Sequence, residues 1–271
     1  MLINTVNDKL DIIVLAGQSN AEGYGLGPHR EPYLPTPRIL SMRDTDNYGY
    51  VVDEKTYGTF NIKMPRSYII NINEERKNTS GRIGCFANRF AQRYMNECLE
   101  PDRKVLLIHS AVGATGFAKH NWGADDVLSV RMLRMCELAI SMNPENRVVA
   151  FLWHQGEHDA IFRPELDDGE RERIHTENLC ALLSRFRERV GKCPILMGTF
   201  TDEWAASQPR SEIIVSAMRN VAESFESAGI VNASGLATNN QALGNGDVYH
   251  FSRSSLYELG DRYFEVYKLL K

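Results

Sequence analysis

Short, unbroken apolar runs are the feature that most limits what this chain can fold into. Residues 12–16 read Ile-Ile-Val-Leu-Ala and end at Gly17. Similar runs recur at residues 105–108, 148–153 and 195–197 and, more weakly, at residues 230–231. A strand with one solvated face alternates apolar and polar residues, whereas a strand buried on both faces is apolar throughout. The pattern therefore predicts five strands of a buried, parallel sheet.

Stretches with helical spacing lie between these runs. Apolar residues recur every three or four positions in five such stretches, at residues 83–98, 127–142, 174–190, 213–225 and 256–270. Strands that alternate with helices favour right-handed crossovers, which place helices on both faces of a parallel sheet. We therefore expect an α/β fold.

The segment from about residue 24 to residue 80 departs from this rhythm. It is rich in Pro, Tyr, Asn and Gly, and it contains short alternating pieces such as Tyr-Val-Val at residues 50–52. We interpret it as a long excursion, with a hairpin, over the edge or the active-site end of the sheet. Because it does not resemble a linker and the chain shows no internal repeat, residues 1–271 are expected to form a single domain.

Composition excludes several classes of protein. The formal net charge is −4, which disfavours binding to a nucleic-acid backbone. No apolar run is long enough to predict a membrane span. The N-terminal residues lack the basic and apolar segments of a signal peptide, so we expect a cytoplasmic protein. The 5 cysteines have no CxxC spacing and predict neither a disulfide framework nor a cysteine zinc site.

Polar and titratable residues follow the predicted strands. The first run is followed by residues 17–20, the second by residues 109–113 and the third by residues 154–159, while residues 247–250 precede the last predicted helix. In open parallel α/β sheets, ligands bind beyond the carboxyl ends of the strands. These four segments are therefore expected to meet at one edge of the sheet.

The residue types in these segments fit a serine hydrolase. Ser19 lies at a strand end in a turn that follows a glycine, and it is the candidate nucleophile, with His250 as its base. Asp247, three residues before His250, is close enough to orient the imidazole. The backbone N–H groups of Ser19 and Gly113 and the side-chain amide of Gln155 are candidate oxyanion donors, each contributing about 3 kcal/mol.

Other interpretations of these residues stay open. His154, Glu157 and His158 match the H-x-x-E-H pattern of zinc peptidases, but that motif requires a helix, and here it follows a strand and contains Gly156. Glu157 and Asp159 are also ordinary capping residues. The G-x-S-x-G elbow of α/β-hydrolases is absent, because Ala21 stands at its last position.

Three motifs together resemble those of the SGNH-hydrolase superfamily. They are Gly-Gln-Ser-Asn at residues 17–20, Trp-His-Gln-Gly-Glu-x-Asp at residues 153–159 and Asp-x-x-His at residues 247–250. From about Ile12 to the C-terminus, the chain is most similar to the sialate O-acetylesterase and acetylxylan esterase branch, carbohydrate esterase family six. The resemblance implies a three-layer, flavodoxin-like α/β/α sandwich. It also implies removal of acetyl groups from sugar hydroxyls without a metal or other cofactor.

The resemblance also implies roles by position. Ser19 would be the nucleophile and His250 the base, with Gly113, Gln155 and the Ser19 backbone N–H as the oxyanion hole. Asn20 would brace the nucleophile loop, in which Gln18 also lies. Two carboxylates compete for the role of triad acid. Asp247 fits the Asp-x-x-His signature and is favoured, whereas Glu157 would either orient His250 in its place or support the site from behind.

The expected function is removal of O-acetyl groups from acetylxylan, acetylated sialic acid or a related sugar, through an acetyl-serine intermediate. The alternatives are a short-acyl lipase or thioesterase of the same superfamily and a non-catalytic carbohydrate-binding protein. The chain departs from the family pattern at Ala21, Ala114 and His158, where Met, Gly and Ser are usual. These departures bear on substrate shape more than on reaction class. Candidates for stacking on a sugar ring, or for ordinary packing, are Tyr24, Tyr48, Tyr50, Tyr57, Trp122 and Trp204.

Overall fold

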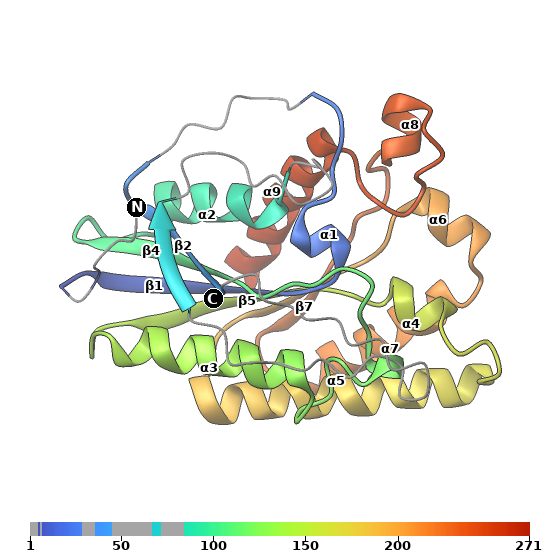
Figure 1. Cartoon of the computed structure of the whole chain (residues 1–271), viewed down its shortest axis with the longest axis horizontal. Coiled ribbons are helices and arrows are strands. Elements are labelled where there is room, and N and C mark those ends of the chain that lie inside the picture. The colour runs from blue at the N-terminus through green and yellow to red at the C-terminus, as the bar shows by residue number, and fades with distance from the viewer. Residues whose placement is uncertain (1–4, 6, 29–35, 45–66, 72–83) are drawn as a thin grey trace.

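The computed structural model describes residues 5, 7–28, 36–44, 67–71 and 84–271. These residues form a seven-stranded sheet and the helices that cover it (Figure 1). The order of the strands across the sheet is β3-β2-β4-β1-β5-β6-β7. Neighbouring strands are parallel, except that β3 is antiparallel to β2 at one edge. The strands are β1 (Lys9–Gly17), β2 (Ile39–Asp44), β3 (Ser67–Asn71), β4 (Arg103–His109), β5 (Arg147–His154), β6 (Ile195–Gly198) and β7 (Ala228–Val231).

The five predicted strands are all present, as β1, β4, β5, β6 and β7, but the prediction of a five-stranded sheet is wrong. A sixth parallel strand, β2, lies inside the segment that we interpret from the sequence as an excursion, and it pairs with β4. Its sequence has no unbroken apolar run, because Ser41 interrupts it after Ile39 and Leu40. β3 pairs antiparallel with β2, as the expected hairpin requires. Residues 50–52 and most of the remaining excursion lie outside the described residues.

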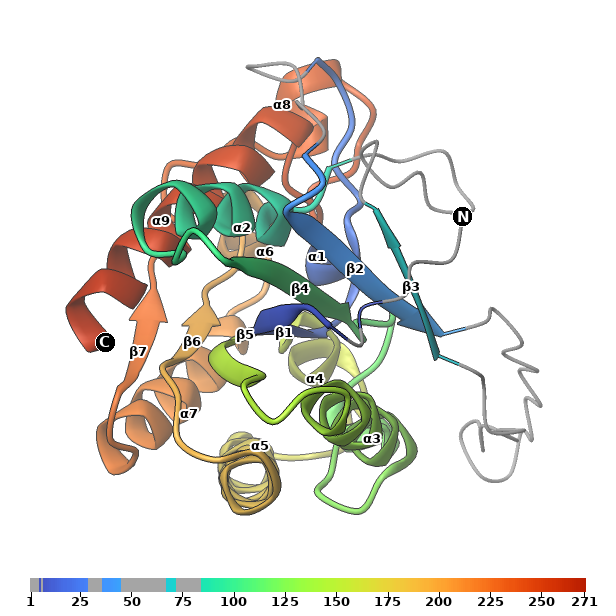
Figure 2. The ribbon, with the colours of Figure 1, turned by 90° about the vertical axis from the view of Figure 1, so that its left-hand side faces the viewer.

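Helices cover both faces of the sheet, as predicted (Figure 2). α2 (Phe86–Glu97) and α9 (Arg253–Leu270) pack together on one face. α3 (Val127–Ser141), α5 (Asp168–Val190) and α7 (Ser211–Ser224) cover the other. Within the residues that the structure describes, no helix combines the length and apolar character needed to cross a membrane.

Two hydrophobic cores explain the unbroken apolar run of β1. Ile12 and Val14 face the core under α3, α5 and α7, whereas Ile13 and Leu15 face the core under α2 and α9. All four side chains are 0% exposed. Burying each of them stabilises the fold by about 1.5–3 kcal/mol. Because both faces of β1 are filled in this way, the strand forms a rigid base for the residues that follow it.

An ionic cluster around a buried aspartate closes the end of the sheet where the central strands begin. Asp11 of β1 is 0% exposed and accepts hydrogen bonds from Arg103 Nε at 2.7 Å, Arg147 Nε at 2.8 Å and Tyr94 Oη at 2.6 Å. Burial raises the pKa of the Tyr94 phenol, and its bond to Asp11 raises it further, so the hydroxyl remains a donor. The cluster joins β1, β4 and β5 and leaves the opposite, carboxyl ends of the strands for the polar loops.

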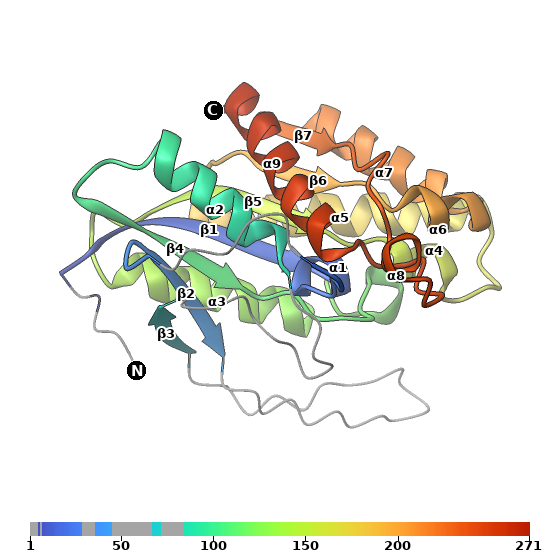
Figure 3. The same ribbon diagram turned by 90° about the horizontal axis from the view of Figure 1, so that it is seen from above.

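Short helices lie beyond those carboxyl ends (Figure 3). They are α1 (Ser19–Glu22), the 3₁₀ turn η1 (Phe117–Lys119), α4 (Glu157–Ile161), α6 (Asp202–Ser207) and α8 (Asn239–Leu243). α1 follows β1 and α4 follows β5, the neighbour of β1 in the sheet. The two loops that carry the predicted site motifs are therefore side by side.

Candidate active site

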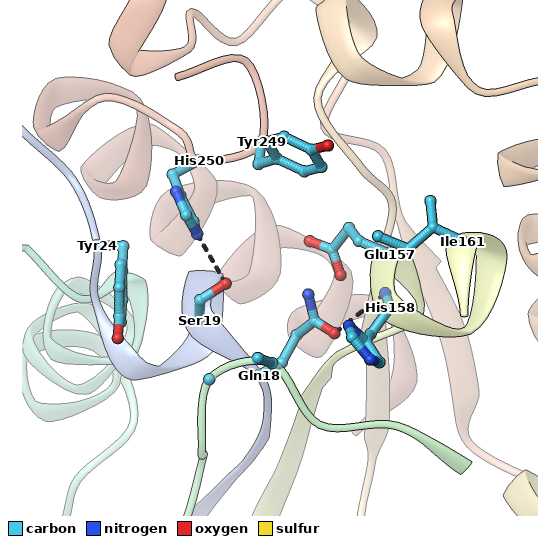
Figure 4. A pocket seen from close by; sticks show the side chains of 10 residues that line it. Gln18, Ser19, Tyr24, Glu157, His158, Ile161, Tyr249 and His250 are labelled. Atoms are coloured by element: carbon cyan, nitrogen blue, oxygen red, sulfur yellow. Dashed lines mark hydrogen bonds between the residues drawn. The ribbon is translucent and has the colours of Figure 1, made fainter. Parts of the chain in front are cut away.

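The carboxyl ends of the central strands open into a cavity of about 440 Å³. Four segments that are distant in the sequence contribute to it, which confirms that the predicted motif loops meet at one edge of the sheet (Figure 4). A cavity of this size is within the range of small-molecule sites. Its lining residues are Gln18, Ser19, Tyr24, Gly113, Ala114, Glu157, His158, Ile161, Tyr249 and His250.

A glycine at the end of β1 turns the backbone toward this cavity. Gly17 has φ +129°, a conformation that residues with a Cβ rarely adopt, and a Cβ there would lie 2.1 Å from the His154 carbonyl oxygen. The N–H of Gln18 donates to that same oxygen at 2.9 Å, and α1 begins at the next residue. Ser19 is therefore the first residue of a helix, and its N–H has no acceptor among the described residues.

Ser19, His250 and Asp247 form a continuous hydrogen-bonded chain. Ser19 Oγ is 2.8 Å from His250 Nε2, and His250 Nδ1 is 2.9 Å from Asp247 Oδ1 and 3.0 Å from Oδ2. Because an ionised carboxylate accepts only, Nδ1 carries the proton and Nε2 accepts from the serine hydroxyl. Asn239 Nδ2 donates to Asp247 Oδ2 at 3.0 Å and fixes the carboxylate. The structure thus brings these three predicted residues together.

The imidazole of His250 also packs against an aromatic ring. The ring of Tyr24 stacks on it with a centroid separation of 4.9 Å and an interplanar angle of 27°. Other contacts hold the neighbouring backbone. Thr201 Oγ1 donates to the Val248 carbonyl at 2.7 Å, and Phe251 forms a β-bridge with Thr238. Figure 4 shows Tyr24 on one side of the Ser19–His250 pair and Gln18 and Glu157 on the other.

The second candidate acid, Glu157, does not hydrogen-bond to His250. It is the first residue of α4 and is 3% exposed. Its Oε1 accepts from Asn20 Nδ2 at 2.7 Å, and its Oε2 has no hydrogen-bond partner among the described residues. Burial raises the pKa of the Glu157 carboxyl. Of the two competing carboxylates, only Asp247 hydrogen-bonds to the His250 ring.

The structure does not bring Gln155 to the cavity. This side chain is 0% exposed, and its Nε2 donates to Asp159 Oδ2 at 2.9 Å and to the Thr115 carbonyl at 3.2 Å. Both of its amide hydrogens thus bond to groups beneath the site. The spacing of the motif predicts the loop of Gln155 correctly, but it carries no information on which way the side chain turns.

A different amide, that of Gln18, faces the cavity. Its Oε1 accepts from the His158 backbone N–H at 3.3 Å. Since an N–H requires an oxygen, this bond fixes the orientation of the amide and turns Nε2 toward the space beside Ser19 (Figure 4). Among the described residues, Nε2 has no acceptor. The position of Gln18 directly before the predicted nucleophile was the only sequence signal for such a donor.

Gly113 lies beside the predicted nucleophile, but its N–H is already engaged. A Cβ at Gly113 would lie 3.6 Å from Ser19 Cβ, so the backbone approaches the serine closely. The N–H of Gly113 donates to Glu22 Oε2 at 2.9 Å. The next residue, Ala114, has φ +57°, in the left-handed region that favours glycine. The departure from glycine at residue 114 therefore leaves a strained alanine at the cavity wall.

Asp159 organises the floor of the site. It accepts from the backbone N–H groups of Phe117 and Ala118 at 3.1 and 3.0 Å, and its Oδ2 lies 3.2 Å from His175 Nδ1. Burial alone would raise the pKa of Asp159, but hydrogen bonds from His175, Ala118 and Gln155 outweigh it and lower the pKa. Asp159 is thus a structural anion that holds the η1 turn against β5 and α5.

The two histidines of the H-x-x-E-H pattern do not share a helix. His154 ends β5, and His158 lies in α4. Burial lowers the pKa of His154 to about 3, and burial with the nearby Lys119 charge lowers that of His158 to about 4. In the described part of the chain, no group of three or more His, Cys, Asp or Glu side chains is arranged to hold a metal ion.

The predicted sugar-stacking residues divide into three groups. Tyr24 lines the cavity. Trp122 and Trp204 are 0% and 1% exposed, so they are core residues, as the packing interpretation held. The remaining candidates, Tyr48, Tyr50 and Tyr57, lie outside the described residues. Tyr249, which was not a candidate, lines the cavity and is 43% exposed.

Comparison with known proteins gives the site a context. Residues 9–268 match the model of a family described as carbohydrate esterase, sialic acid-specific acetylesterase. A search of curated proteins finds no match.

Solved structures share the fold at low sequence identity. NanS is 18% identical, with a TM-score of 0.67 and 97% of each chain covered. A protein from Arabidopsis thaliana is 18% identical, with a TM-score of 0.65 and coverage of 97% of this chain and 98% of that one. A carbohydrate acetylesterase from Xanthomonas citri is 11% identical, with a TM-score of 0.61 and coverage of 96% and 56%.

Proposed function

Since the chain belongs to the carbohydrate esterase family of sialic acid-specific acetylesterases, we propose that it removes O-acetyl groups from a carbohydrate through an acetyl-serine intermediate. Membership confirms the predicted resemblance and makes the chain a carboxylic ester hydrolase. The observation that carries the mechanism is the hydrogen-bonded chain from Ser19 through His250 to Asp247 at the floor of an open cavity.

Acylation begins with the serine hydroxyl. As Ser19 Oγ attacks the acetyl carbonyl carbon, its proton passes to His250 Nε2, 2.8 Å away. Asp247 holds the other ring nitrogen and stabilises the imidazolium that forms. The imidazolium then returns the proton to the sugar oxygen as the ester bond breaks. The sugar leaves as an alcohol, and the acetyl group stays on Ser19.

The negative charge on the carbonyl oxygen needs donors that are free to receive it. The Ser19 N–H at the start of α1 and the Gln18 Nε2 turned toward the same space are the two donors that we assign to this role. The Gly113 N–H joins them only when the Glu22 carboxylate releases it. Gln155, whose amide is bonded beneath the site, is not part of this assignment.

Deacylation repeats the chemistry with water. His250 takes a proton from a water molecule, whose oxygen attacks the acetyl carbon of acetyl-Ser19. The same donors stabilise the second tetrahedral intermediate. Its collapse releases acetate and returns the proton to Ser19 Oγ, which restores the starting state.

The reaction is tested by hydrolysis of an activated acetate ester by the wild type and Ser19→Ala. We expect kcat/KM to fall at least ~10⁴-fold in the variant, because the nucleophile is lost. Equal rates would exclude the proposal. A series of acyl chain lengths then separates a deacetylase, whose rate declines beyond acetyl or propionyl, from a short-acyl lipase or thioesterase. The substrate is identified by comparing the rates of acetate release from acetylated xylan, acetylated sialic acid and simple acetylated sugars.

A further inference from the structure

One asparagine joins the two segments that carry the proposed nucleophile and base. Asn20 follows Ser19 in α1 and is 1% exposed. Its Oδ1 accepts from the Phe251 backbone N–H at 3.2 Å, and its Nδ2 donates to the Tyr249 carbonyl at 3.1 Å. Tyr249 and Phe251 are the two chain neighbours of His250. The amide therefore holds the backbone on both sides of the base.

The carboxyl of Glu157 completes the hydrogen bonding of this amide. A primary amide has two N–H donors and one carbonyl oxygen. The Phe251 N–H requires the oxygen and the Tyr249 carbonyl requires one hydrogen, so the second hydrogen is directed to Glu157 Oε1, 2.7 Å away. Without this acceptor, a buried N–H would lose its partner, which makes the observed orientation of the amide less favourable.

We propose that Asn20 and Glu157 are positioning residues that set the Ser19–His250 distance. Glu157 fixes the Asn20 amide, and the amide fixes the segment that carries His250. The proposal rests on the proposed function of Ser19 and His250. It gives Glu157 a part in catalysis without direct contact with the imidazole, because its hydrogen bond reaches His250 only through Asn20.

The hydrogen bond, rather than the charge of Glu157, is the active feature. Glu157 is 3% exposed, and burial raises the pKa of its carboxyl, which disfavours the ionised form. The carbonyl-type oxygen that faces Asn20 is an acceptor whether the group is ionised or protonated. A glutamine offers the same oxygen without any charge. A role through the hydrogen bond and a role through charge therefore predict different behaviour for Glu157→Gln.

The test compares Glu157→Gln with Glu157→Met, which has similar length but no acceptor oxygen. With an activated acetate ester, we expect kcat of Glu157→Met to fall about 100-fold with KM within about twofold, because the serine and the base separate while the cavity persists. Glu157→Gln should lose less than about fivefold. Equal losses in the two variants would overturn the proposal in favour of charge, and an unimpaired Glu157→Met would overturn it outright.

Asn20 provides a second pair of variants. Asn20→Asp keeps the shape but places an acceptor against the Tyr249 carbonyl and the Glu157 carboxyl, so kcat should fall as in Glu157→Met. Asn20→Ala removes all the hydrogen bonds of the Asn20 amide to Tyr249, Phe251 and Glu157, which together we call the clamp. Its kcat should fall at least as much. If Asn20→Ala retains full kcat, the clamp has no role in positioning.

Crystal structures of the same variants give a readout that does not depend on turnover. The Ser19 Oγ–His250 Nε2 separation, 2.8 Å in the wild type, should remain in Glu157→Gln and exceed about 3.5 Å in Glu157→Met. An unchanged separation in Glu157→Met would contradict the positioning role. If the wild type hydrolysed no ester, the proposed function would fail, while this distance would still decide whether the clamp exists.

Discussion

At the scale of single residues, contact rather than motif membership separates the two candidate acids. Asp247 and Glu157 both belong to motifs of the sequence, and the Asp-x-x-His signature favoured Asp247 without excluding Glu157. The structure gives Asp247 two contacts of 2.9 and 3.0 Å with the His250 ring and gives Glu157 a contact with Asn20. Such a distinction depends on side-chain direction, which a linear pattern does not contain.

The amide replacement of each acid tests this distinction. Asp247→Asn should lower kcat by up to ~10⁴-fold, because an amide NH₂ facing Nδ1 favours the wrong tautomer of His250. Glu157→Gln should lower it less than about fivefold, because the acceptor for Asn20 remains. Steady-state kinetics on one acetate ester measure both. A larger loss in Glu157→Gln would reverse the assignment of the triad acid.

The oxyanion donors give a second test at this scale. Gln18→Met keeps the length of the side chain but removes Nε2, and kcat should fall about 10²–10³-fold. The control is thermal unfolding, since the Oε1 bond to the His158 N–H is lost as well. A folded Gln18→Met variant with the wild-type kcat would show that the amide does not stabilise the oxyanion.

Ala114 gives a prediction about stability. Its φ of +57° is unfavourable for a residue with a Cβ, so Ala114→Gly should raise the free energy of unfolding by about 1 kcal/mol. Urea unfolding of the two proteins measures the difference. A loss of stability in the variant would show that the alanine methyl group makes compensating contacts in the folded state.

At the scale of elements, the strands with unbroken apolar runs were predictable from the sequence, whereas β2 was not. β1, β4 and β5 are covered on both faces, and their apolar runs indicate this directly. β2 carries Ser41 within it, so it has no unbroken apolar run, and it is identified only through its pairing with β3 and β4. Whether such a segment forms a strand depends on the strands it pairs with. The local pattern of apolar residues carries no information about that pairing.

The end of β5 carries a group that makes stability depend on pH. Burial lowers the pKa of His154 from 6.5 to about 3. Between these two pH values, His154 is therefore neutral in the folded chain but protonated in the unfolded chain. The free energy of unfolding therefore falls as the pH drops from 6.5 toward 3, and the loss from this group is about 2 kcal/mol at pH 5. Urea unfolding between pH 7 and pH 5 should show a shallower decline in His154→Gln. An identical decline would assign the effect to other groups.

At the scale of the whole molecule, the sequence predicted where chemistry occurs better than how each group serves it. The four segments at residues 17–20, 109–113, 154–159 and 247–250 meet at the carboxyl end of the sheet because parallel strands place them there. Gln155 is bonded beneath the site, Gln18 faces the cavity, and Asn20 connects the segment of Ser19 to that of His250. The roles of Gln18 and Asn20 arise from contacts between segments more than 100 residues apart, and that of Gln155 arises from the direction of its side chain. The spacing within one motif encodes neither.

The most direct test of the proposed mechanism is to trap the acyl-enzyme. The wild type is mixed with an activated acetate ester, quenched with acid during the first turnover and digested for mass spectrometry. The peptide that contains Ser19 should gain one acetyl group on that residue, and neither the label nor turnover should appear in Ser19→Ala. An acetyl group on another residue, or continued turnover by Ser19→Ala, would contradict the account.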